Sequence, residues 1–259
     1  MHEFPGALAH DGFEGVAEVE GGGIAQGIAD YFALSPVLEM QLKGKDKEAE
    51  RQVVNTIAHL ARVESVCQKE PKGLGDAVLC ARDFVGEEPF AVMLGDDIIH
   101  NPGRPAMGQL LDAYARFGCP VIGMRKVPHG DVNRYGIISG EPLSDGVCVV
   151  EDLVEKPSVE EAPTDMAIMG RYVLTPDIFD SLRQTGPGAG GEIQLTDGLR
   201  KLAGRKKIIG LAFEGQRYHV GDPLAFLKAN VEYGLRSPEF GCEFQKYLRC
   251  LDLNGWRQE

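Results

Sequence analysis

A strand-like apolar run that ends in two aspartates constrains the fold of this chain more than any other feature. Residues 90–94 read Phe-Ala-Val-Met-Leu, and Gly95, Asp96 and Asp97 follow directly. An uninterrupted apolar run is typical of a strand in a parallel sheet that is buried on both faces. Ligands of open α/β sheets bind at the carboxyl ends of strands, so the two acids indicate an ion site, for which Mg²⁺ is a good match. The alternative is that the two acids cap a helix.

Strand and helix patterns alternate around that run. This alternation predicts an α/β fold with a parallel sheet that helices cover on both faces. Three strand candidates in the middle of the chain are separated by turn residues only, and they predict an antiparallel addition to the sheet. The predicted strands are 63–67, 90–94, 119–127, 135–138, 147–154, 167–174 and 207–213, and the predicted helices are 48–61, 74–81, 107–114, 192–203, 223–235 and 239–251.

The length of 259 residues allows one α/β domain with an appendage or two small domains, and we favour one. Residues 1–23 are rich in Gly, Ala, Glu and His and show no clear period. We therefore expect a weakly ordered lead-in over residues 1–27 and a single domain over residues 28–259.

The acidic composition limits the classes of partner. A formal net charge of −12 argues against binding to nucleic acid or to anionic membranes, both of which require basic patches. No apolar stretch approaches the roughly 20 residues that span a bilayer, and the sequence start lacks a signal-peptide pattern, so we expect a cytoplasmic protein. The six cysteines are widely spaced, and we expect reduced thiols.

Three further motifs are candidate ligand sites, and each also has an ordinary structural explanation. In the Lys-Gly-Leu-Gly of residues 72–75, glycines let the backbone approach a flat ligand, although a plain turn explains them too. Glu155 and Lys156 end a strand before Pro157, where they could bind a sugar hydroxyl and a phosphate, or form a solvated turn. Because neighbouring strand residues point to opposite faces, we expect that these two do not pair. Residues 188–197 form a loop that feeds a helix, for which a loop with a cap is the alternative to ligand binding.

Taken together and in this order, the motifs resemble the bacterial UTP-glucose-1-phosphate uridylyltransferases, a branch of the sugar-nucleotide pyrophosphorylases. The resemblance extends from residue 28 to the C-terminus. It implies a Rossmann-like mixed sheet of the nucleotide-diphospho-sugar transferase type with C-terminal helices, and a dimer or tetramer. The matching segments are 68–70, 72–81, 93–97, 134–138, 154–157, 167–174, 188–197 and 217–230.

The resemblance also implies a reaction and a set of site residues. A phosphate oxygen of glucose-1-phosphate attacks the α-phosphorus of UTP, and UDP-glucose and pyrophosphate result. Such a transfer needs in-line positioning and positive charge rather than a covalent nucleophile. Asp96 and Lys156 are the implied catalytic residues. The implied contacts are Gln68 and Gly75 with the uracil ring, Asp96 with Mg²⁺, Gly136 and Glu155 with the glucose hydroxyls, and Lys156 with the sugar phosphate.

Two departures from the family's pattern bear on activity. Residues 1–27 do not match the family's opening strand and its G-x-G-T-R loop, which holds the nucleotide phosphates. We therefore expect a fold that is incomplete at its N-terminus and an impaired activity. The family usually has Asp at the position of His219, a candidate second metal ligand, and histidine is a poor substitute on Mg²⁺. The alternative hypothesis is a catalytically dead homologue that binds a sugar nucleotide or an active paralogue as a regulatory subunit.

Overall fold

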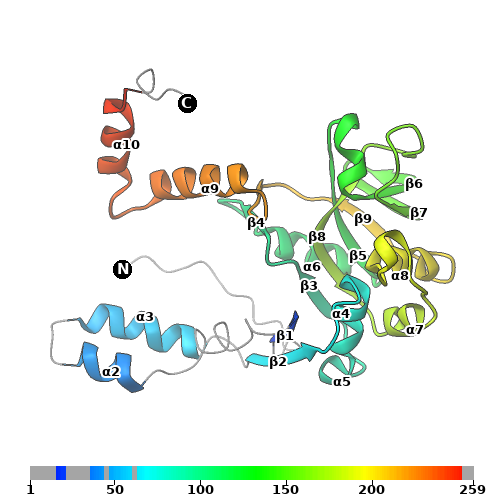
Figure 1. Ribbon diagram of the computed structural model, residues 1–259, viewed down its shortest axis with the longest axis horizontal. Coiled ribbons are helices and arrows are strands. Elements are labelled where there is room, and N and C mark those ends of the chain that lie inside the picture. Colours follow the sequence, from blue (N-terminus) through cyan, green and yellow to red (C-terminus); the bar gives the residue numbers. More distant parts are fainter. Residues whose placement is uncertain (1–15, 22–35, 44–46, 60–62, 253–259) are drawn as a thin grey trace.

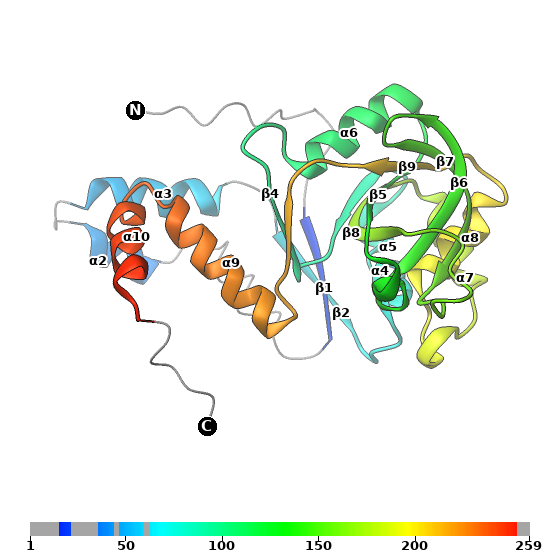
Figure 2. The ribbon, with the colours of Figure 1, turned by 90° about the horizontal axis from the view of Figure 1, so that it is seen from above.

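A six-stranded mixed sheet forms the centre of the molecule. The computed structural model describes residues 16–21, 36–43, 47–59 and 63–252 of the chain. Helices pack against this sheet, while two helix pairs lie away from it on the left of Figure 1, and the view from above in Figure 2 has the same separation. The predicted mixed α/β architecture with C-terminal helices is confirmed.

The sheet combines one parallel pair with antiparallel neighbours. Among its strands in the described residues, only β5 and β9 run parallel. One further pairing, between Ile137 and Ala167, joins β6 to β8, so the strands from β8 to β6 curl back on themselves. The strands in spatial order are β3 (Phe90–Met93), β8 (Met166–Leu174), β5 (Val121–Lys126), β9 (Ile209–Ala212), β7 (Val147–Glu155) and β6 (Gly136–Ser144). The predicted antiparallel addition is thus confirmed as β6, β7 and β8.

The prediction of a fully buried parallel strand at 90–94 is wrong for the described residues. β3 pairs antiparallel with β8, and Met93 is 60% exposed. The apolar residues of β3 pack mainly to one side, where the ring of Phe90 stacks on Phe179 at 5.2 Å between centroids. An apolar run reports burial of side chains but not the direction of the neighbouring strand, which explains the error.

Two hydrophobic cores cover the two faces of the sheet, as predicted. One core contains side chains of α4 (Leu74–Cys80), α7 (Asp177–Arg183) and α8 (Leu195–Ala203), and the other contains those of α6 (Ala106–Phe117). β8 contributes to both cores, because successive strand residues face opposite sides. Its side chains in the first core are Ile168, Tyr172 and Leu174, and those in the second are Ala167, Met169 and Val173.

Two short two-stranded ribbons flank the main sheet. β1 (Val16–Gly21) pairs parallel with β2 (Val63–Gln68), and β4 (Asp97–His100) pairs antiparallel with β10 (Gln216–His219). β1 lies within the predicted lead-in, and the sequence patterns did not predict it. The other lead-in residues lie outside the described residues, so the division at residue 27 stays a prediction.

The remaining helices connect or extend these elements. Their bounds are α2 (Pro36–Leu42), α3 (Glu48–Ala58), α5 (Arg82–Val85), η1 (His129–Arg134), η2 (Ala189–Gly191), α9 (Pro223–Arg236) and α10 (Gly241–Cys250). α9 begins directly after β10, where the side chain of Asp222 accepts a hydrogen bond of 2.8 Å from the Ala225 N–H. Within the described ranges, no helix combines the length and apolarity that crossing a membrane requires.

Candidate active site

The turn between β3 and β4 carries the two aspartates. Asp97 is the first residue of β4, and its N–H donates to the carbonyl of Leu94 at 3.3 Å. The turn lies against Gly170 of β8, which has a φ of +59°, and a Cβ added there would lie 2.7 Å from Asp97 Oδ2. A glycine at position 170 therefore permits the close approach of the aspartate turn to the sheet.

Arg171, the next residue of β8, holds this turn because its side chain hydrogen-bonds to backbone carbonyls. Its Nη1 donates to the carbonyls of Leu94 at 2.9 Å and Gly170 at 3.0 Å, and its Nη2 donates to the carbonyl of Asp97. Burial lowers the pKa of Arg171, while the charges of Asp97 and Asp96 oppose that shift. One guanidinium thus fixes both ends of the turn that presents the carboxylates.

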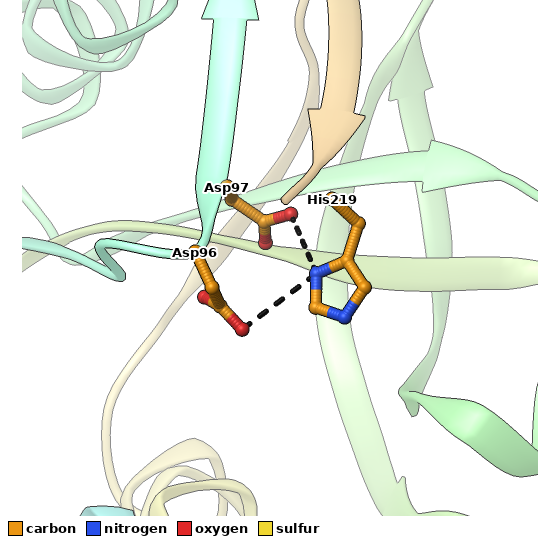
Figure 3. Close-up of side chains that lie close together, drawn as sticks. All are labelled: Asp96, Asp97 and His219. Carbon is orange, nitrogen blue, oxygen red and sulfur yellow. Dashed lines mark ion pairs between the residues drawn. The ribbon is translucent and has the colours of Figure 1, made fainter. Parts of the chain in front are cut away.

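β10 brings a histidine to the same place. The β10–β4 register pairs His219 with Asp97, and the N–H of Val220 donates to the carbonyl of Asp96 at 2.7 Å. Figure 3 shows both carboxylates directed toward the imidazole. His219 Nδ1 lies 3.4 Å from Asp97 Oδ1 and 3.6 Å from Asp96 Oδ2.

Arg217 compensates the charge of Asp97. Its Nη2 lies 2.6 Å from Asp97 Oδ1, and both side chains are buried, with 13% and 5% exposed. Burial raises the pKa of the Asp97 carboxyl; Arg217 lowers it, and the like charge of Asp96 raises it further. The guanidinium also lies over the ring of Tyr135 at 5.4 Å, and its Nη1 donates to the Tyr135 hydroxyl at 3.4 Å.

Asp96, Asp97 and His219 form a set that could hold a divalent metal ion. One ligand atom from each lies within 4.8 Å of the others. His219 Nδ1 is buried without a hydrogen-bond partner among the described residues, whereas Asp97 Oδ1 is paired with Arg217 Nη2 at 2.6 Å. Buried polar atoms without hydrogen bonds are costly, and a bound cation would remove that cost. The residues present therefore fit a divalent ion.

Glu155, Gly136 and Lys156 form a second cluster at the adjacent ends of β6 and β7. The register pairs Gly136 with Glu155, and Thr196 of α8 donates to Glu155 Oε2 at 2.6 Å. Lys156 Nζ lies 3.7 Å from Glu155 Oε1, so the prediction that these two do not pair is wrong. Lys156 follows the strand with a φ of +45°, and this left-handed backbone breaks the alternation on which the prediction depended.

Tyr135 links the two clusters. Its carbonyl accepts a hydrogen bond of 2.9 Å from the Lys156 N–H, while its ring contacts Arg217, the partner of Asp97. Burial and the charges of Glu155, Asp97 and Asp96 also raise the pKa of the buried Tyr172 hydroxyl. The Tyr135 contacts thus connect the aspartate turn, through Arg217, with the Glu155–Lys156 pair.

Gln68 and Gly75 belong to neither cluster. Gln68 ends β2, and Gly75 lies in the first turn of α4. Gln68 is buried, and its Nε2 donates to Asp76 Oδ2 at 2.7 Å and to the carbonyl of Gly73 at 3.2 Å. The Gly75 N–H donates to the carbonyl of Ile193 at 2.8 Å, and an added Cβ would lie 2.7 Å from that oxygen. Loop 72–75 is therefore fastened to the segment that leads into α8, and α8 carries Thr196.

Arg171, Arg217 and Tyr135 are site residues that the sequence patterns missed, whereas Thr196 lies within the candidate ligand site at residues 188–197. Two signals could have found the arginines. Arg171 is a charged residue inside an otherwise apolar strand, and Arg217 stands two positions before His219, which places both on one face of β10. Lys156 and Arg217, the partners of Tyr135, are distant from it in sequence, so no local pattern predicts its role.

Comparison with known proteins gives consistent results. Residues 36–235 match the family described as nucleotidyl transferase. The chain is 45% identical over 240 residues to the UTP–glucose-1-phosphate uridylyltransferase YngB of Bacillus subtilis, covering 93% of this chain and 80% of that protein. It is 43% identical over 226 residues to a UTP–glucose-1-phosphate uridylyltransferase of Staphylococcus epidermidis, covering 87% and 78%.

Solved structures agree with these sequence matches. A UDP-glucose pyrophosphorylase complexed with UDP-glucose superposes with a TM-score of 0.78 at 37% identity, covering 85% of this chain and 81% of that one. A UTP-bound UGPase from Acinetobacter baumannii gives a TM-score of 0.75 at 32% identity, covering 87% and 79%. Similarity in sequence and in fold thus covers the elements that carry both clusters.

Proposed function

The chain belongs to the nucleotidyl transferase family, and we propose on that premise that it makes UDP-glucose and pyrophosphate from UTP and glucose-1-phosphate. The observation that carries the proposal is the 43–45% identity to UTP–glucose-1-phosphate uridylyltransferases over 87–93% of the chain. Among the described residues and the comparisons, nothing favours the alternative of a catalytically dead regulatory subunit.

We assign the glucose-1-phosphate end of the site to Gly136, Glu155 and Lys156. Glu155 is a mostly buried carboxylate whose Oε2 already accepts from Thr196, and a second oxygen remains for sugar hydroxyls. A Cβ at Gly136 would lie 3.1 Å from Glu155 Oε2, so a glycine here lets the carboxylate lie against the backbone of β6. The Lys156 side chain is 54% exposed, so its ammonium can neutralise a phosphate that arrives from solvent.

We assign the triphosphate end to Asp96 and a divalent cation, for which we propose Mg²⁺. The support is the grouping of Asp96, Asp97 and His219, in which the buried His219 Nδ1 has no hydrogen-bond partner among the described residues. When bound, the ion supplies positive charge to the phosphate oxygens of the nucleotide. Arg171 and Arg217 keep the aspartates in position, because their guanidinium groups hold the turn and balance its charge.

We assign the contacts with the uracil ring to Gln68 and Gly75. The support is their position, because Gln68 is the last residue of β2 and Gly75 is the second residue of α4, which follows the carboxyl end of that parallel strand. The Gly75 N–H is already donated to Ile193, so we expect this glycine to contact the base by packing rather than by a hydrogen bond.

In this assignment the chain catalyses the transfer by positioning. Lys156 and Glu155 orient the sugar phosphate, and one of its oxygens forms the new bond to the α-phosphorus of UTP. The bond from that phosphorus to the bridging oxygen breaks, and pyrophosphate leaves with this oxygen and its electron pair. Fixed geometry and local positive charge lower the barrier, and the step requires no protein nucleophile.

We also propose that the protein is a homo-oligomer, a dimer or a tetramer, in the cytoplasm. Large apolar side chains are exposed along α9 and α10, among them Leu227 at 62% and Tyr247 at 60%. All six cysteines are free thiols in the described residues, which is consistent with a reducing compartment.

A panel of substrates tests the proposed function. Pyrophosphate release is measured with UTP and glucose-1-phosphate, and then with either substrate replaced by dTTP, ATP or another sugar phosphate. We expect the highest kcat/KM for UTP with glucose-1-phosphate. Release only with dTTP, or only with a different sugar phosphate, would overturn the substrate assignment.

A further inference from the structure

We propose that His219 is a direct metal ligand, and that it gives the cluster of Asp96, Asp97 and His219 a preference for borderline first-row ions such as Co²⁺ over Mg²⁺. This inference goes beyond the proposed function, because uridylyl transfer itself does not require a nitrogen ligand. It concerns how tightly the site binds each ion rather than which nucleotide it uses.

The placement of the imidazole supports direct coordination. Nδ1 faces both carboxylates, at 3.4 Å from Asp97 Oδ1 and 3.6 Å from Asp96 Oδ2 (Figure 3). Adjacent ligand atoms around one ion at metal–ligand distances near 2.1 Å lie about 3 Å apart, so a small side-chain adjustment completes the geometry. Asp97 Oδ1 is paired with Arg217 Nη2 at 2.6 Å, but His219 Nδ1 has no hydrogen-bond partner in the described residues, so hydrogen bonding does not explain the position of the imidazole.

The charge balance around the cluster disfavours a hard ion that depends on excess negative charge. Asp96 and Asp97 contribute two negative charges, and the neighbouring Arg217 and Arg171 contribute two positive charges. Arg217 forms an ion pair with Asp97, and the pKa of Arg171 is influenced by both aspartates. With the charges balanced, an incoming ion gains little from long-range attraction and depends on the strength of its coordination bonds.

The chemistry of the ligands then decides between ions. Mg²⁺ prefers oxygen ligands and gains little from imidazole, whereas affinity for nitrogen rises along the first row toward Co²⁺ and beyond. A carboxylate in place of His219 would supply an oxygen ligand and a negative charge. His219→Asp should therefore shift the preference toward Mg²⁺.

Binding of Co²⁺ and Mg²⁺ to the full chain without substrates tests this inference. Titration calorimetry gives the dissociation constant for Co²⁺, and competition gives that for Mg²⁺. We expect His219→Asp to lower the ratio of the Mg²⁺ to the Co²⁺ constant by about tenfold or more. His129→Ala is the matched control, because His129 also pairs with an aspartate, Asp165 at 2.8 Å, outside the cluster. This variant should leave the ratio unchanged.

A spectroscopic readout on the unmodified chain makes the test independent of variant folding. Coordination of His219 to paramagnetic Co²⁺ should give a strongly shifted, solvent-exchangeable imidazole N–H resonance in the proton NMR spectrum. The resonance should persist in His129→Ala and disappear in His219→Ala. A Co²⁺ complex without this resonance, or an unchanged ratio in His219→Asp, would overturn the inference. Uridylyl transfer with Mg²⁺ would survive that result, so failure here is distinguishable from failure of the proposed function.

Discussion

Gly136 packs closely against Glu155 and Thr196 in the proposed glucose site. An added Cβ would lie 2.8 Å from Thr196 Oγ1 and 3.1 Å from Glu155 Oε2, so Gly136→Ala pushes on the hydrogen-bonded pair that faces the sugar. We expect kcat/KM for glucose-1-phosphate to fall about tenfold or more, with little change in the KM for UTP. Steady-state pyrophosphate release, with each substrate varied in turn, measures both quantities.

Gly130 provides the matched control for this prediction. A Cβ added there meets nothing within 4 Å, so Gly130→Ala should keep both constants. An equal rise in the KM for both substrates in Gly136→Ala would speak against a specific role in sugar binding.

Burial divides the cysteines into two classes of reactivity. Burial raises the pKa of the thiols of Cys80, Cys119 and Cys148, so these carry little reactive thiolate at pH 8. Titration of the native protein with a thiol reagent such as DTNB should show a fast phase from the exposed thiols only, and unfolding should release the rest. The exposed thiols are those of Cys67, Cys242 and Cys250. Fast reaction of all six thiols in the native state would disagree with the described core.

Among the elements, the turn between β3 and β4 depends on a single side chain of β8. Arg171 donates to three backbone carbonyls, and Arg171→Met leaves these acceptors without that donor. We expect the free energy of unfolding to fall by about 3 kcal/mol, because each buried hydrogen bond contributes about 1 kcal/mol. Urea denaturation measures this quantity.

Arg200 offers a comparison at the surface. Its guanidinium makes two hydrogen bonds to Asp152, but both side chains are substantially exposed. Arg200→Met should cost less than about 1 kcal/mol. If the two variants cost the same, the turn does not depend on Arg171.

Helices and strands with a clear local sequence pattern were predicted correctly, and those without one were missed. The strand at 167–174 was predicted correctly because nearly all its side chains are buried between the two cores, which gives a long apolar run. β1 was missed because the residues around it are rich in glycine and acids. The neighbours of β3 could not be predicted, since strand pairing depends on contacts with residues far along the chain.

The site was predictable where its residues carry their own signal. The paired aspartates and the Glu155–Lys156 step stand out in the sequence, and in the fold Tyr135 contacts Lys156 and the Asp97 partner Arg217. Arg171 could not be assigned in advance, because its partners are up to 77 residues away. The backbone of Lys156 was likewise unpredictable, because a positive φ at a non-glycine residue is set by its surroundings.

For the whole molecule, the exposed apolar side chains of α9 and α10 predict self-association. Leu227 is 62% exposed on α9, and Leu143 is 48% exposed on β6. Light scattering coupled to size exclusion should give a mass of at least two chains. Leu227→Asp should weaken the assembly, because burying a charge in an apolar interface is costly, and Leu143→Asp should not. A monomer at all concentrations would refute this prediction.

The central claim is that Asp96 and Lys156 serve one reaction, in which UTP and glucose-1-phosphate give UDP-glucose. The most direct measurement is the rate of UDP-glucose formation by the unmodified chain, by Asp96→Asn and by Lys156→Met. We expect product only with a divalent ion, and a loss of about 100-fold or more in each variant. Absence of UDP-glucose with the unmodified chain, or undiminished rates in both variants, would contradict the claim.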